Sequence, residues 1–131
     1  MAWLWVEPRM VPQWEREQTD RLGLHLTTSL ALAADPAATA LAALSQLPPG
    51  PLALHLNVDV LDFTDAPLAE NTGGRNTGPT LGQAAEALTA ARDQRMRALS
   101  IGELNPTRAR DPDALPRFVS SIARILAATT N

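Results

Sequence analysis

Polar residues that could do chemistry lie within the longest apolar run of the sequence. The even-numbered residues from 54 to 60 are apolar, and His55, Asn57 and Asp59 alternate with them. Successive side chains of a β-strand point to opposite faces, so this spacing predicts one shared polar face. Burying polar groups without partners costs several kcal/mol, so these groups need hydrogen-bond partners or a ligand. Asp59 and Asp62 come towards the carboxyl end of the run, where open α/β sheets bind ligands.

A second acidic candidate, Glu103, comes at the end of another apolar run, in the segment Ile101–Pro106. The carboxyl ends of parallel strands meet at one edge of a sheet, so we expect Glu103 to join Asn57 and Asp59 there. The resulting acidic cleft would suit a hard cation or a cationic substrate. The alternative is a polar strand end that only caps a neighbouring loop, and both interpretations remain open on the residues alone.

The composition excludes several kinds of chemistry. The chain has 131 residues, a net charge of −3, no Cys and no Lys. It therefore cannot form a lysine Schiff base, a thiolate nucleophile, a disulfide or a thiolate metal site. The acidic balance argues against nucleic-acid binding. No run suits a membrane span and the start lacks a signal peptide's basic flank, so we expect a cytoplasmic protein. Both histidines, His25 and His55, fit packing better than catalysis.

The elements that must position these residues alternate along the chain. Apolar strand-like runs cover residues 2–6, 24–28, 52–63 and 98–104. Helical segments cover residues 13–22, 36–47 and 80–94, and a last helix begins near residue 111 or 113. Strands and helices that alternate at this rhythm are typical of βαβ units. We therefore predict a single α/β domain over 1–131, with a parallel sheet of about four strands and about four helices on both of its faces.

Two motifs carry a resemblance to a known family. The segment Asn57–Asp62 resembles the Asp-x-Asp-x-x-Asp motif of the arginase/agmatinase (ureohydrolase) family. Glu103–Pro106 resembles the Glu-(Val/Leu)-Asn-Pro motif of the same family, and the helix opening at Gly78–Leu81 between them also fits. The resemblance covers essentially the whole chain but only the C-terminal half of the family. It implies half of an arginase-like three-layer α/β/α fold.

The resemblance also implies a two-manganese site whose bridging hydroxide attacks a guanidinium or amidine carbon. Asp59 would match a ligand of one metal, and Glu103 would match the carboxylate that pairs with the guanidinium. Asn57 stands where the family has a metal-bridging Asp, and an amide cancels no positive charge. The family's histidine motifs, Gly-Gly-Asp-His and Asp-Ala-His-x-Asp, belong to the N-terminal half and are absent from these residues.

Our leading interpretation is an arginase-like, metal-dependent hydrolase domain that acts on guanidino or amidino C–N bonds. We expect it to be inactive as this chain alone and to be completed in a homo-oligomer or by a partner chain. The alternative is a non-catalytic binding or assembly subunit that keeps the fold. An unrelated α/β small-molecule domain is a third possibility. The neutral Asn57 favours the second interpretation, whereas Asp59 and Glu103 favour the first.

Overall fold

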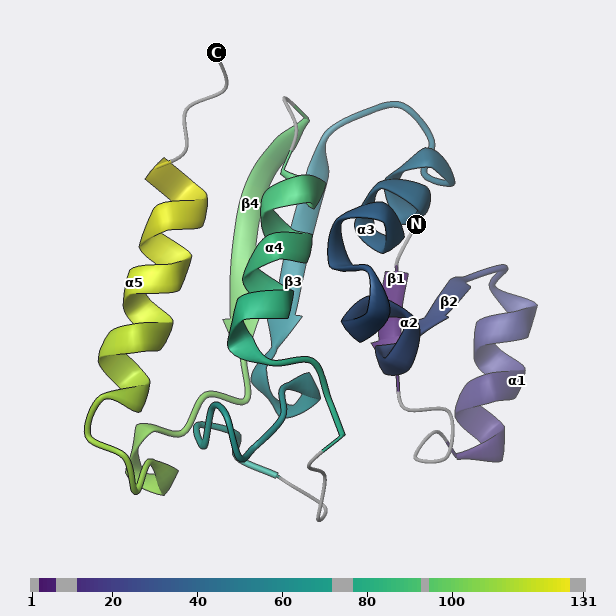
Figure 1. Ribbon diagram of the computed structural model, residues 1–131. Coiled ribbons are helices and arrows are strands. Elements are labelled where there is room, and N and C mark those ends of the chain that lie inside the picture. The colour runs from purple at the N-terminus through teal and green to yellow at the C-terminus, as the bar shows by residue number, and fades with distance from the viewer. Residues whose placement is uncertain (1–2, 7–11, 72–76, 93–94, 128–131) are drawn as a thin grey trace.

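Alternating strands and helices make up the chain. The computed structural model describes residues 3–6, 12–71, 77–92 and 95–127, and these contain the elements labelled in Figure 1. The strands are β1 (Trp3–Val6), β2 (His25–Thr28), β3 (Leu52–Asn57) and β4 (Met96–Gly102). The α-helices are α1 (Gln13–Arg21), α2 (Ser29–Ala34), α3 (Pro36–Ser45), α4 (Leu81–Ala91) and α5 (Ala114–Ala127). No described helix combines the length and apolar character of a bilayer span.

The strands pair in parallel, which confirms the predicted α/β class. β1 pairs with β2, and β3 pairs with β4. Among the described residues these are two separate two-stranded sheets, whereas the sequence pattern suggested one sheet of about four strands. In the larger pair, Leu56 lies opposite Ile101 and Asn57 lies opposite Gly102. This register brings the carboxyl ends of β3 and β4 together.

One face of the β3–β4 pair carries the main hydrophobic core. Leu56 of β3, Leu88 of α4 and Phe118 of α5 are all buried in one cluster. Figure 1 shows α4 in front of β3 and β4, with α5 on one side and α3 on the other. On the opposite face, His55 and Ser100 are exposed. The helices described around this pair therefore cover one face, and the second helical layer that the sequence suggested does not cover the other.

Local capping explains where the helices begin. Asp35 accepts a hydrogen bond from the backbone of Ala38 and precedes the proline that opens α3, as its sequence predicts. Thr80 and Gln83 form the predicted capping box at the start of α4. The short helix α2 is not predicted by the sequence pattern, and it begins because the Thr28 hydroxyl caps it.

Candidate functional site

The end of β3 sets the position of Asn57 and Asp59. The strand stops at Asn57, and residues Val58–Val60 form a single 3₁₀ turn. Asn57 Oδ1 accepts a hydrogen bond from the Asp59 backbone N–H at 2.8 Å, so the Asn57 side chain itself caps this turn. Asp59 therefore lies beyond the strand. The prediction that it shares a strand face with His55 and Asn57 is wrong, because the asparagine side chain competes with continued strand pairing.

Glu103 joins the same edge of the sheet, as the sequence predicts. It directly follows Gly102, the strand partner of Asn57. Glu103 is exposed and has a φ of 58°, and it is the single non-glycine residue with positive φ among the described residues. A side chain in this left-handed region costs about 1 kcal/mol or more. The surrounding loop must therefore hold Glu103 in place.

The segment 68–71 forms the loop that contacts the residues following β3 and β4. The Glu103 carbonyl oxygen accepts from the backbone N–H of Glu70 at 2.9 Å, and the Asn105 N–H donates to Leu68 O at 2.7 Å. Asp59 Oδ1 in turn accepts from the Asn71 N–H at 3.1 Å. One short segment, 68–71, thus connects Asp59 of the first motif to Glu103 of the second.

Two polar residues of this arrangement escape prediction from the sequence. The Glu70 carboxylate accepts a hydrogen bond from the Asn105 side-chain amide, and Arg108 donates to the Glu70 carbonyl oxygen at 3.1 Å. The sequence shows Asn105 only as part of an Asn-Pro strand stop, and Glu70 only as a loop acid. The hydrogen bond between Asn105 and Glu70 joins residues that are far apart in sequence, so no local pattern predicts it.

Other sequence candidates have local partners. Asp62 Oδ1 accepts from both the backbone N–H and the hydroxyl of Thr64, so Asp62 caps its own turn. His55 Nδ1 lies 2.8 Å from the Ser100 hydroxyl on the open face of the sheet. His25 lies on β2, in the other strand pair. None of these three residues is placed with Asn57, Asp59 and Glu103 by a described hydrogen bond.

The described residues do not fit a two-manganese centre by themselves. No group of three or more His, Cys, Asp and Glu side chains within the described ranges is placed to hold a metal ion. Asn57 Oδ1 and Asp59 Oδ1 already accept backbone hydrogen bonds. Two adjacent dications need several anionic oxygens to offset their mutual repulsion. The manganese that the resemblance implies would therefore need ligands from outside these residues.

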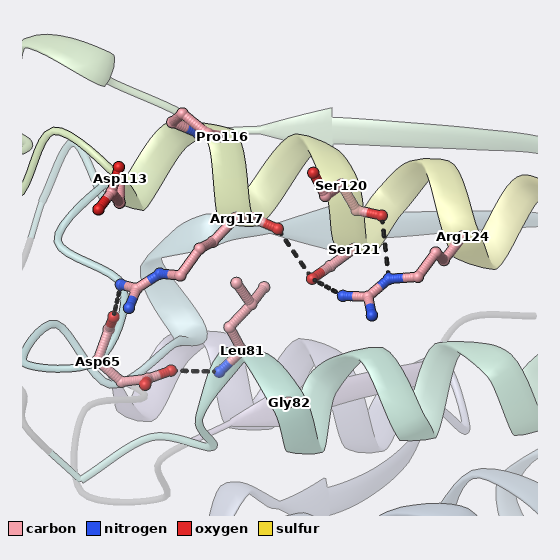
Figure 2. Close-up of a pocket in the computed structure, with 9 residues that line it drawn as sticks. All are labelled: Asp65, Leu81, Gly82, Asp113, Pro116, Arg117, Ser120, Ser121 and Arg124. Carbon is pink, nitrogen blue, oxygen red and sulfur yellow. Dashed lines mark hydrogen bonds between the residues drawn. The ribbon is translucent and has the colours of Figure 1, made fainter.

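A separate hollow of about 520 Å³ lies between the start of α4 and the side of α5, as Figure 2 shows. Asp65 Oδ2 accepts from the backbone N–H of Leu81 at 2.7 Å, and Arg117 donates to the Asp65 carbonyl oxygen at 3.0 Å. Arg117 also forms an ion pair with Asp111 at 3.1 Å. Arg124 donates to the carbonyl oxygen of Ser120 within its own helix. Asp65 thus links the start of α4 to α5, so we assign this hollow a structural role.

Comparison with known proteins identifies the fold. No protein-family model and no curated protein sequence matches the chain. Among solved structures, arginase from Bacillus subtilis superposes with a TM-score of 0.76 and 18% identity, covering 92% of this chain and 43% of its own. A hypothetical agmatinase from Burkholderia thailandensis gives a TM-score of 0.68 at 18% identity, covering 82% of this chain and 34% of its own. Arginase from Medicago truncatula gives 0.67 at 19% identity, covering 92% and 37%.

These matches agree with the resemblance of the two motifs, and they confirm it at the level of the fold. The chain spans less than half the length of each of these structures. The chain thus has the arginase/agmatinase fold over a part of that fold's length.

Proposed function

We propose that this chain is an arginase-like hydrolase domain that supplies Asp59 and Glu103 to a site for a guanidino or amidino group. One observation carries the proposal. Within an arginase-like fold, the ends of two paired parallel strands bring Asn57 and Glu103 to one edge. The loop 68–71 joins Asp59 to the same edge through Asn71.

The chemistry of this edge suits a cationic substrate. Glu103 is exposed, and a carboxylate there can pair with a planar guanidinium through two parallel hydrogen bonds. The positive φ of Glu103 costs conformational free energy, and backbone strain of this kind is typical of functional sites. Asp59 adds a second carboxylate, so the edge attracts a cation.

Hydrolysis requires more than this chain provides. The described residues do not hold a metal centre, and no described hydrogen bond joins either histidine to Asp59 or Glu103. We therefore assign binding and orientation of the guanidino group to this chain, and water activation to groups supplied from elsewhere. Alone, the chain should release no urea from arginine or agmatine, even with added manganese.

The test is co-expression with a polypeptide that carries the family's two histidine motifs, Gly-Gly-Asp-His and Asp-Ala-His-x-Asp. We expect the complex to release urea from arginine or agmatine, and the variant Glu103→Gln to lose this activity. Glu86→Gln is the matched control, because Glu86 is an exposed glutamate on α4 far from the strand ends in sequence. Activity that survives Glu103→Gln as well as it survives Glu86→Gln would overturn the proposal.

A non-catalytic assembly subunit is the second candidate, and Asn57 favours it. Its amide carries no charge and its oxygen is already used in capping the turn at Asp59. If this candidate holds, the complex forms but releases no urea with any substrate of the guanidino class. The same co-expression experiment therefore separates the two functions.

A further inference from the structure

Glu70 is held at each of its polar groups by the segment that carries Glu103. Its backbone N–H donates to the Glu103 carbonyl oxygen at 2.9 Å, and its own carbonyl oxygen accepts from Arg108 at 3.1 Å. Its carboxylate accepts a hydrogen bond from the Asn105 side-chain amide. The backbone and the side chain of one exposed loop residue thus both hold the second motif.

The chain on either side of Glu70 is anchored separately. The two residues before it are buried, and the second of them, Ala69, forms an antiparallel bridge with Leu104. Asn71, which follows Glu70, donates its N–H to Asp59 Oδ1 at 3.1 Å. Glu70 therefore lies between a contact with the second motif and a contact with the first motif.

Asn105 offers Glu70 a donor of fixed orientation. The Asn105 Oδ1 accepts from the backbone N–H of Thr107 at 3.0 Å and from the Thr107 hydroxyl at 2.6 Å. A backbone N–H can only donate, so the amide oxygen must face Thr107 and the NH₂ group must face Glu70. An ionised carboxylate can only accept, so the Asn105–Glu70 pair has one arrangement of donor and acceptor.

Glu103 is the residue that these contacts restrain. Its φ of 58° is a left-handed backbone conformation that costs a non-glycine residue free energy. Such a conformation persists only where the surrounding structure fixes the chain. The Glu70 N–H fixes the Glu103 carbonyl oxygen, and the Glu70 carboxylate fixes Asn105 two residues later.

We infer that Glu70 is a positioning residue of the candidate site: through its bond to Asn105 it keeps the Glu103 carboxylate oriented for a planar guanidinium. The inference rests on the proposed function, because it assigns Glu103 to a guanidino group. A carboxylate and a guanidinium pair through two parallel hydrogen bonds, which requires an oriented carboxylate. An ammonium ion is a compact point charge without that requirement. Loss of the Glu70 bond should therefore weaken guanidinium binding more than ammonium binding.

Attraction of a cation by the charge of Glu70 is the alternative role, and it predicts a different result. Glu70→Gln removes the charge but keeps a side-chain oxygen that can accept from Asn105. Glu70→Ala removes both the charge and the acceptor. A positioning role is therefore kept in Glu70→Gln and lost in Glu70→Ala, whereas attraction by charge is lost in both.

The experiment titrates the full chain with methylguanidinium and, separately, with methylammonium, and follows the Glu103 amide by NMR. We expect the wild type to bind methylguanidinium about fivefold more tightly than methylammonium, or better. Glu70→Ala should bring the two affinities close to equality, and Glu70→Gln should keep the wild-type ratio. Glu86→Ala is the matched control, because it removes one exposed glutamate from α4 and should leave the ratio unchanged.

A second pair of variants decides the test if circular dichroism shows that Glu70→Ala does not fold. Asn105→Asp places two carboxylates against each other and should also remove the preference for methylguanidinium. Adding Glu70→Gln restores a hydrogen bond with donor and acceptor exchanged. The double variant should therefore recover the preference, and its failure to do so overturns the inference.

The outcomes separate this inference from the proposed function. Equal affinity of the wild type for the two cations overturns the proposed function, and this inference with it. A preference for methylguanidinium that persists in Glu70→Ala leaves the proposed function standing and overturns the inference. A preference that is lost in Glu70→Gln as well as in Glu70→Ala assigns Glu70 a role through its charge, and it also overturns the inference.

Discussion

Gly78 lies directly against the carbonyl oxygen of Val60. A Cβ atom built at position 78 would lie 2.0 Å from that oxygen and 2.9 Å from the Asp62 nitrogen. The adjacent Pro79 carbonyl accepts a hydrogen bond from the same Asp62 N–H at 2.9 Å. The segment before α4 is therefore seated on the backbone that follows the first motif, and only glycine allows this approach.

Gly78→Ala should lower the free energy of unfolding by about 3 kcal/mol or more, because a methyl group cannot fit against a backbone oxygen without moving the chain. Gly82→Ala is the control. A Cβ atom built at position 82, in the first turn of α4, would lie 3.8 Å from the Thr80 hydroxyl, which is an ordinary contact. That change should raise stability by about 0.5–1 kcal/mol. Urea denaturation of both variants measures the contrast, and equal effects would contradict it.

Glu103→Gly should raise the free energy of unfolding by about 1 kcal/mol, because glycine adopts positive φ without the steric cost that Glu103 carries. Glu86→Gly, in the middle of α4, should instead lower it by about 1 kcal/mol. Urea denaturation again provides the readout. If both variants lose stability to the same degree, the positive φ of Glu103 does not cost the folded protein free energy.

If the polar end of β3 is a metal site that has lost a ligand, Asn57→Asp should raise affinity for Mn²⁺ by at least tenfold, or about 1.4 kcal/mol, in calorimetric titration. The new carboxylate would lie next to Asp59, because the side chain at position 57 already accepts a hydrogen bond from the Asp59 backbone N–H. Hard anionic oxygens are the ligands that manganese prefers. Adding Asp59→Ala should remove the gain. Asp62→Ala should leave it, because Asp62 is engaged with Thr64.

Negligible binding by the wild type and by all three Asn57→Asp proteins would contradict this expectation. The polar groups at the end of β3 would then serve the local turn and the loop 68–71 rather than a metal.

The isolated chain should not persist as a compact monomer. The edge of β3 that has no strand partner among the described residues favours association. Multi-angle light scattering at micromolar concentration should give a mass that exceeds 14.0 kDa and rises with concentration. A fusion that adds one extended strand of five residues to the chain through a Gly/Ser linker is the control, since pairing with the edge of β3 should lower the mass towards that of one chain. A compact, well-folded monomer of the unfused chain would contradict the expectation.

Local sequence signals predicted most of the elements and the main feature of the site. The Asp35–Pro36 and Thr80–Gln83 caps are complete within a few residues, so they can be recognised without knowing the fold. The convergence of Asn57 and Glu103 follows from a general property of parallel strands. These predictions depend on neighbours in sequence or on rules that hold for a whole fold class.

The features that the sequence predicted wrongly or did not predict depend on choices between competing local bonds or on distant partners. At Asn57 the alternating pattern predicts a longer strand, but the side chain forms a turn with the Asp59 backbone. The contact of Glu70 with Asn105 joins residues 35 positions apart, and no local pattern signals it. Strand order is equally non-local, so the separation of the two strand pairs could not be read from the apolar runs.

The separation of the β1–β2 pair from the β3–β4 pair determines how the chain unfolds. The two pairs share no described strand hydrogen bond, so α2 and α3 provide the connection between them. The β1–β2 pair is then free to open at a lower free energy than the β3–α4–β4 unit, as separate cooperative units do within one protein.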